Sequence, residues 1–413
     1  MKIGSFIAAV LVLFCLIGAG CSPDSGLDAS LNSIVKPYRF DIVGWELEAL
    51  SGELEEVLFG DEEASADESP VVLEYFSVME KIRALGREIE AVRSGVEMGD
   101  IASLESEMNI LQEQQGDLER QAEKIIEGQI RETLTQLGIF NPLDGCIGLE
   151  TGFPPVNFII EEPPKVLVVS LRDNIESIRE ITLVMDVTLE EIENIEEAVD
   201  GLGVSSLVVN VGGMATYPAF VASSASLRFT INAAIEEWLH QYLFFKPLGF
   251  MYALDLLGVS RGYEIAIINE TLVGMVSNEI GDILYRNYYA KYDEETGQTG
   301  AAEPEFDFNQ EMRDIRKQVD EYLARGEIEL AEEFMEQKRL YLISQGYYIR
   351  KLNQAYFAFY GTYADSPTSI DPIGIELRTL RDKCDSAKDF LDKVALITSR
   401  SELIESIGVD EGR

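Results

Sequence analysis

The sequence predicts an α+β fold that is mainly helical, and three observations support this. Apolar residues recur every three or four positions between residues 82 and 125, as they do along a pair of amphipathic helices. A β-branched run over 165–171 and a run interrupted by paired glycines over 204–221 predict a small sheet. From residue 309 onward the helical periodicity returns. Apolar residues make up 46% of the 413 residues, which is enough for a sizeable core.

The first 20 residues have the pattern of a signal peptide. A lysine precedes an apolar run over 3–17, and small residues follow directly before Cys21. The run is too short to cross a bilayer comfortably. The segment resembles a bacterial lipoprotein signal, and this resemblance implies lipidation of Cys21 and an extracytoplasmic protein anchored to the cell membrane. Plain secretion and an uncleaved anchor are the alternatives. Residues 21–70 are expected to form a polar tether and an acidic loop.

The charge and the cysteine content limit which partners and which disulfides the protein can have. There are 74 acidic and 33 basic residues, so the net charge is −41. Such a surface repels phosphate backbones, which argues against a nucleic acid partner. Beyond the signal and Cys21, the cysteines are Cys146 and Cys384, which allow at most one intramolecular disulfide. Nothing in the sequence decides whether these two pair.

Residues 71–137 are predicted to form an antiparallel helical hairpin. Two heptad-spaced segments are separated by the break at 97–100, and short breaks favour antiparallel neighbours. A coiled coil that binds a partner is the functional alternative. Beyond the hairpin, residues 188–203 predict a capped helix that ends at glycine. The segments predicted to be helical in the C-terminal half are 309–326, 327–346, 347–361 and 374–396.

His240 is the only histidine of the chain, and it lies in the frame Glu-Glu-Trp-Leu-His. On a helix, Glu236 and His240 share one face and Glu237 projects beside them. This is the layout of the H-E-x-x-H zinc motif with glutamate at the first ligand position. A carboxylate oxygen binds zinc at a distance similar to that of imidazole, so the exchange is chemically admissible. The alternative is an ordinary amphipathic helix that happens to contain a histidine.

A second apolar-periodic segment, 263–282, supplies the third candidate ligand in its Asn269-Glu270 pair. Together the two segments resemble the gluzincin metallopeptidases, in which the zinc helix is followed by a helix whose Asn-Glu pair completes the site. The resemblance covers roughly residues 160–400 and implies a site helix pair within a metallopeptidase-like domain at 138–413. The chain differs from the family in its first ligand and in the 29 residues between His240 and Glu270, which are more than is usual.

The resemblance implies a chemistry and a set of roles. Glu236, His240 and Glu270 would hold Zn²⁺, and a metal-activated water would hydrolyse a peptide bond of a peptide or protein substrate. Glu237 would take the proton of that water. The segment 213–221 resembles the edge strand on which these enzymes bind a substrate backbone. The rival hypothesis is a non-catalytic envelope scaffold or binding protein that keeps the fold.

The group that would stabilise the oxyanion cannot be chosen from the sequence alone. The segment 347–361 offers four candidates: Tyr348, Arg350, Tyr356 and Tyr360. Tyr356 is the residue we select, although its spacing to Tyr360 is also typical of core packing. The Ser/Pro/Asp-rich segment 362–372 is expected to be a connector, with lining of the site as the lesser alternative.

The resemblance also predicts a geometry. The ligand atoms of Glu236, His240 and Glu270 should converge, and Glu237 should point into the same space. Glu279 lies half a turn away around its helix from Glu270 and should face elsewhere. The residues between His240 and Glu270 are expected to fold as a loop and a short helix.

Overall fold

The computed structural model describes residues 26–42, 44–46, 68–96, 98–142, 152–256, 262–293, 306–366 and 369–408. It is an α+β fold that is mainly helical, which confirms the predicted fold class. The signal segment, Cys21 and Cys146 lie outside the described residues, so lipidation remains a prediction and the pairing of Cys146 with Cys384 remains open. In the described part of the chain, no helix combines the length and the apolar character needed to span a bilayer.

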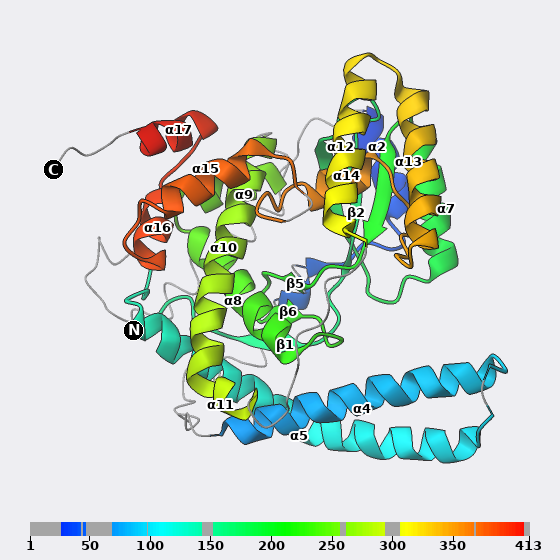
Figure 1. Ribbon diagram of the computed structural model, residues 1–413, viewed down its shortest axis with the longest axis vertical. Coiled ribbons are helices and arrows are strands. Elements are labelled where there is room, and N and C mark those ends of the chain that lie inside the picture. Colours follow the sequence, from blue (N-terminus) through cyan, green and yellow to red (C-terminus); the bar gives the residue numbers. More distant parts are fainter. Residues whose placement is uncertain are drawn as a thin grey trace.

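Figure 1 labels the elements along the chain. The helices are α2 (Gly26–Val35), α4 (Ser69–Arg93), α5 (Ile101–Gln136), α7 (Leu189–Asp200), α8 (Leu227–Leu243), α9 (Pro247–Leu256), α10 (Tyr263–Tyr288), α11 (Ala290–Asp293), α12 (Phe308–Ala324), α13 (Ile328–Ser344), α14 (Gln354–Tyr360), α15 (Pro372–Arg381), α16 (Ala387–Val394) and α17 (Arg400–Gly408). The strands are β1 (Phe158–Ile160), β2 (Lys165–Ser170), β3 (Ser177–Leu183), β4 (Ser205–Val209), β5 (Gly213–Met214) and β6 (Ala219–Val221).

The predicted helical hairpin is formed by α4 and α5, which lie side by side and project from the body of the molecule (Figure 1). Asp100 begins α5 by accepting a hydrogen bond from the N–H of Ala102. The buried residues of α5 all lie between Ala122 and Leu134. The near half of the hairpin therefore packs on the body, and the far half is a solvated arm.

The small sheet of the prediction consists of two separate three-stranded sheets, ordered β3-β2-β4 and β1-β6-β5. In β2, Leu167 and Val169 pack with α2 and α7 on one face, and Val166 and Val168 pack near α14 on the other. Burial on both faces explains why this strand is apolar from Val166 to Val169, without the alternation of a half-exposed strand.

The second sheet is fastened to the hairpin and leads directly into α8. The backbone N–H groups of Phe158 and Ile160 in β1 donate to the carboxylates of Glu127 and Glu123 in α5, at 3.2 and 2.7 Å. Arg83 of α4 donates to the carbonyl of Ser224, just before α8, at 2.8 Å. These bonds satisfy the buried edge of β1 that lies opposite β6, and they fix the start of α8 relative to the hairpin.

The C-terminal half is helical as predicted, but two predicted boundaries are wrong. The single helix expected over 374–396 is divided into α15 and α16, because the Ser386 hydroxyl accepts the N–H of Asp389 and starts a new helix. The helix expected over 347–361 is confined to α14, because Asn353 caps it at the N–H of Tyr356. Helices α15, α16 and α17 pack against α10 in the main core.

Candidate metal centre

Helix α8 carries the first two site residues. Its N-terminus is fixed by Ser226, whose hydroxyl accepts the N–H of Phe229. Much of its remaining surface is buried, and it packs closely on α10. The close approach depends on Gly281 of α10, because a Cβ there would overlap the side chain of Asn232. Asn232 donates to Asn278 across the same contact at 2.7 Å. The crossing of these two helices sets the geometry of the site.

The structure brings Glu236, His240 and Glu270 together. One ligand atom from each of the three lies within 4.8 Å of the other two. The Nε2 atom of His240 is 3.7 Å from Oε1 of Glu270. Zinc bonds of about 2.1 Å in a tetrahedral site place ligand atoms about 3.4 Å apart, so small side-chain rotations would bring this group to bonding distance. These three residues can hold a metal ion, and the predicted convergence is present.

The electrostatics of the site favour a cation. Burial raises the pKa of Glu236 to about 8, and the charges of Glu270 and Asp365 add to the effect. Burial raises the pKa of Glu237 well above its usual range, and Glu236 and Glu270 add to it. Within the described ranges, no Lys or Arg forms an ion pair with any of these three glutamates. Ionised carboxylates without a partner are costly in a buried site, and a divalent cation would relieve this repulsion.

Glu237 is buried beside the other two acids, as predicted. Its carboxylate lies against the backbone of β5, because a Cβ added at Gly213 would overlap Oε1 of Glu237. β5 is the edge strand of its sheet, with β6 on one side. The absence of a side chain at Gly213 therefore lets the carboxylate approach the edge strand directly.

Two tyrosines that the sequence alone did not indicate lie at the site. The Tyr252 hydroxyl donates to Oε1 of Glu270 at 2.5 Å, and its ring lies 5.8 Å from the His240 ring, centroid to centroid. Tyr363 is close enough to the site that burial, together with the charges of Glu270, Glu236 and Glu237, raises its pKa well above the usual range. Tyr252 lies on α9, the short helix expected between His240 and Glu270. Tyr363 lies in the 362–372 segment, for which lining of the site was the lesser alternative.

The residues proposed from 347–361 make other contacts. Tyr356 packs on Tyr360, with ring centroids 4.5 Å apart, and belongs to the core between β2, β4 and α14. Arg350 donates to both oxygens of Glu196 at 2.6 and 2.8 Å. Tyr348 is 86% exposed. None of these described contacts is with the three candidate ligands.

Glu279 faces away from the site, as predicted. Its carboxylate accepts two hydrogen bonds from Arg381 of α15, at 2.8 and 3.0 Å. Asn269, next to Glu270, is fully buried, and its amide has no hydrogen-bond partner among the described residues. The buried Nδ1 of His240 is also without a partner in this part of the chain.

Comparisons with models of protein families, with curated proteins and with solved structures find no match to this chain. The functional interpretation therefore depends on the residues of the site and their geometry.

Proposed function

We propose that the protein is a zinc-dependent peptidase. The observation that carries the proposal is the convergence of Glu236, His240 and Glu270 beside a third acid, the buried Glu237. Carboxylate oxygens and an imidazole nitrogen are ordinary zinc ligands, and three protein ligands leave a position open, as in catalytic zinc sites. When bound, zinc supplies an activated water and polarises the carbonyl to be attacked.

The chain's own residues have the following roles in this proposal. Glu237 takes the proton of the attacking water and delivers it to the leaving amine. Tyr363 replaces Tyr356 as the candidate donor to the oxyanion, because the charges of Glu270, Glu236 and Glu237 act on its buried hydroxyl and so mark it as a neighbour of the site. The raised pKa of Tyr363 keeps the phenol protonated and hence able to donate.

The expected substrate is a peptide or protein in extended conformation. β5 forms the edge of its sheet, and Gly213 in this strand touches the carboxylate of Glu237. A peptide added beside β5 as a further strand would place its backbone near the proposed base. We further propose that lipidation of Cys21 tethers the enzyme to the outer face of the cell membrane, so that its substrates are extracytoplasmic. The net charge of −41 argues against nucleic acids as substrates.

The proposal is tested by zinc binding and turnover with one variant. Metal-free protein is titrated with zinc, and cleavage of a fluorogenic peptide library is measured with the wild type and with Glu237→Gln. We expect one zinc per chain in both proteins and cleavage only by the wild type. Absence of zinc binding at micromolar metal would contradict the peptidase.

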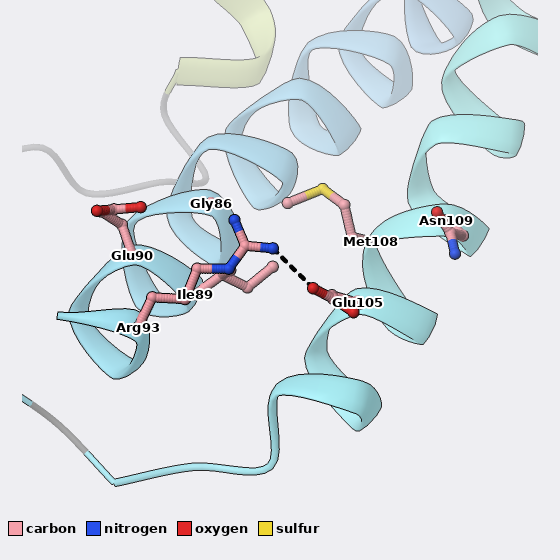
Figure 2. Close-up of a pocket in the computed structure, with 7 residues that line it drawn as sticks. All are labelled: Gly86, Ile89, Glu90, Arg93, Glu105, Met108 and Asn109. Atoms are coloured by element: carbon pink, nitrogen blue, oxygen red, sulfur yellow. Dashed lines mark hydrogen bonds and ion pairs between the residues drawn. The ribbon is translucent and has the colours of Figure 1, made fainter. Parts of the chain in front are cut away.

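Stoichiometric zinc without turnover would favour the second candidate, a non-catalytic scaffold or binding protein of the envelope. The hairpin supports this candidate, because no residue of α5 before Ala122 is buried and this part of the hairpin carries a shallow hollow of about 390 Å³ (Figure 2). Arg93 of α4 and Glu105 of α5 form an ion pair at 2.7 Å beside this hollow. Gly86, Ile89 and Met108 line it.

A further inference from the structure

We infer that Tyr252 is a positioning residue for the metal site. It lies on α9, outside the helix pair α8 and α10, and it holds Glu270 in the orientation in which this residue would bind the metal. The inference rests on the proposed metal site. It assigns a role to α9, which lies in the long stretch between His240 and Glu270.

Tyr252 contacts two of the three candidate ligands. Its hydroxyl donates to Oε1 of Glu270, the same oxygen that faces Nε2 of His240 at 3.7 Å. Its ring lies beside the His240 ring at 5.8 Å. The side chain of Tyr252 therefore orients the Glu270 carboxylate and packs beside the His240 imidazole. Residues that contact metal ligands from outside the coordination sphere orient those ligands in this way.

Helix α9 is held firmly enough to serve as this support. At its start, the N–H of Leu248 donates to the carbonyl of Ala395 at 3.1 Å, and Leu248 is fully buried. Gly249 packs so closely on the backbone of Leu243 that a Cβ would overlap it. Towards its end, Asp255 accepts the N–H of Gly262, the residue before α10, at 2.8 Å. The position of Tyr252 is thus set relative to both site helices.

The hydrogen bond also offsets a chemical consequence of glutamate at position 236. Two carboxylate ligands donate more negative charge to a metal than one, and a more neutralised metal is a weaker Lewis acid. A hydroxyl that donates to a ligand oxygen withdraws part of that charge. Tyr252 donates such a bond to Glu270, so it counteracts the additional carboxylate of Glu236.

The test compares Tyr252→Phe with Tyr289→Phe in the full chain. Tyr289 is the matched control, because its hydroxyl also donates at 2.5 Å to a side-chain oxygen, that of Gln129, at the far end of α10. Zinc affinity is measured by competition with a chromophoric chelator, and the visible absorption spectrum is recorded after loading with Co²⁺. Thermal unfolding of the metal-free proteins reports the structural cost of each substitution.

We expect Tyr252→Phe to weaken zinc binding by about 10- to 100-fold and to change the Co²⁺ spectrum, as loss of an outer partner of a metal ligand does. Tyr289→Phe should lower thermal stability and leave zinc affinity and the spectrum unchanged. Unchanged affinity and spectrum in Tyr252→Phe would overturn the inference while the metal site stands. Failure of the wild type to bind zinc or Co²⁺ would instead remove the metal site itself. If Tyr252→Phe lowers the thermal stability of the metal-free protein, the affinities are compared at a temperature at which both variants remain folded, and the same comparison decides.

Discussion

The glutamates at the hairpin base and those at the candidate metal centre all lie on helices and are buried or partly buried, but their carboxylates have different partners. Glu123 of α5 accepts the N–H of Ile160 at 2.7 Å and lies 3.4 Å from a guanidinium nitrogen of Arg120. Glu127 accepts the N–H of Phe158 at 3.2 Å and lies 3.1 Å from a lysine of the same helix. Each of these carboxylates has a backbone donor and a cation.

In the described part of the chain, the site glutamates accept no backbone N–H and form no ion pair with a lysine or arginine. Glu270 accepts a hydrogen bond from the Tyr252 hydroxyl, and the charges that act on Glu236 and Glu237 are those of other acids. A raised pKa does not distinguish the two sets, because burial raises the pKa of Glu123 to about 7 and that of Glu236 to about 8. The difference lies in the compensating partners. Buried acids with backbone and cationic partners stabilise the fold, whereas buried acids that face one another create a site for a cation.

The largest expected effect is the loss of metal binding in Glu270→Gln. Removal of a ligand should weaken zinc binding by more than about 100-fold, since outer partners alone contribute about 10- to 100-fold. Glu127→Gln, which alters an acid of the other set, should bind zinc like the wild type. Thermal unfolding with and without zinc measures this, because a ligand at 100 times its Kd stabilises by about 2.7 kcal/mol. If zinc stabilised the two variants equally, the acids at the candidate metal centre would not differ from those at the hairpin base in binding a cation.

Gly213→Ala should impair turnover without releasing the metal. The new Cβ would overlap the Glu237 carboxylate and push it from its position against β5. Displacement of a catalytic group by about 1 Å costs about 100-fold in rate, so we expect a loss of about 10- to 100-fold in kcat/KM. Gly116→Ala on α5 is the control, since a Cβ there meets no atom within 4 Å. A variant Gly213→Ala as active as the control would show that Glu237 is not positioned by β5.

Glu127→Ala tests directly whether the acids at the hairpin base stabilise the fold. It leaves the buried N–H of Phe158 without its acceptor, which should lower the free energy of unfolding by about 1–3 kcal/mol. Glu127→Gln retains an acceptor oxygen and should cost less. Denaturant unfolding of the metal-free proteins measures both. Should the two variants be equally stable, the carboxylate would not hold the strand edge.

The smallest expected effect is a change in the pH dependence of stability in Glu123→Gln. In the folded protein the pKa of Glu123 is raised from 4.5 to about 7, chiefly by burial. The folded state therefore binds more protons than the unfolded state between these values, and this glutamate lowers the free energy of unfolding as pH rises through that window. Removal of the titrating group should flatten the wild-type decline over this pH window. Parallel pH profiles of the metal-free proteins would contradict this.

The sequence by itself determined the features that depend on neighbouring residues. The hairpin follows from heptad spacing, and α7 follows from a capping box in which Thr188 and Glu191 bond one another's backbone. The placement of Glu236 and His240 on one helix face follows from helical geometry alone. Glu270 was identified through the resemblance, and the structure places it beside His240.

Only the tertiary structure decided the features that depend on contacts between distant segments. The two separate sheets arise because strand partners are chosen across the chain, as in the pairing of β1 with β6. Tyr252 and Tyr363 reach Glu270 only through the packing of α9 and of the connector before α15, and no local periodicity marks a hydroxyl for that purpose. Tertiary structure also decides which partners a buried acid has. The sequence alone does not distinguish Glu127 from Glu237. In the structure, Glu127 contacts the edge of β1 and a lysine, whereas the charges that act on Glu237 are those of two more carboxylates.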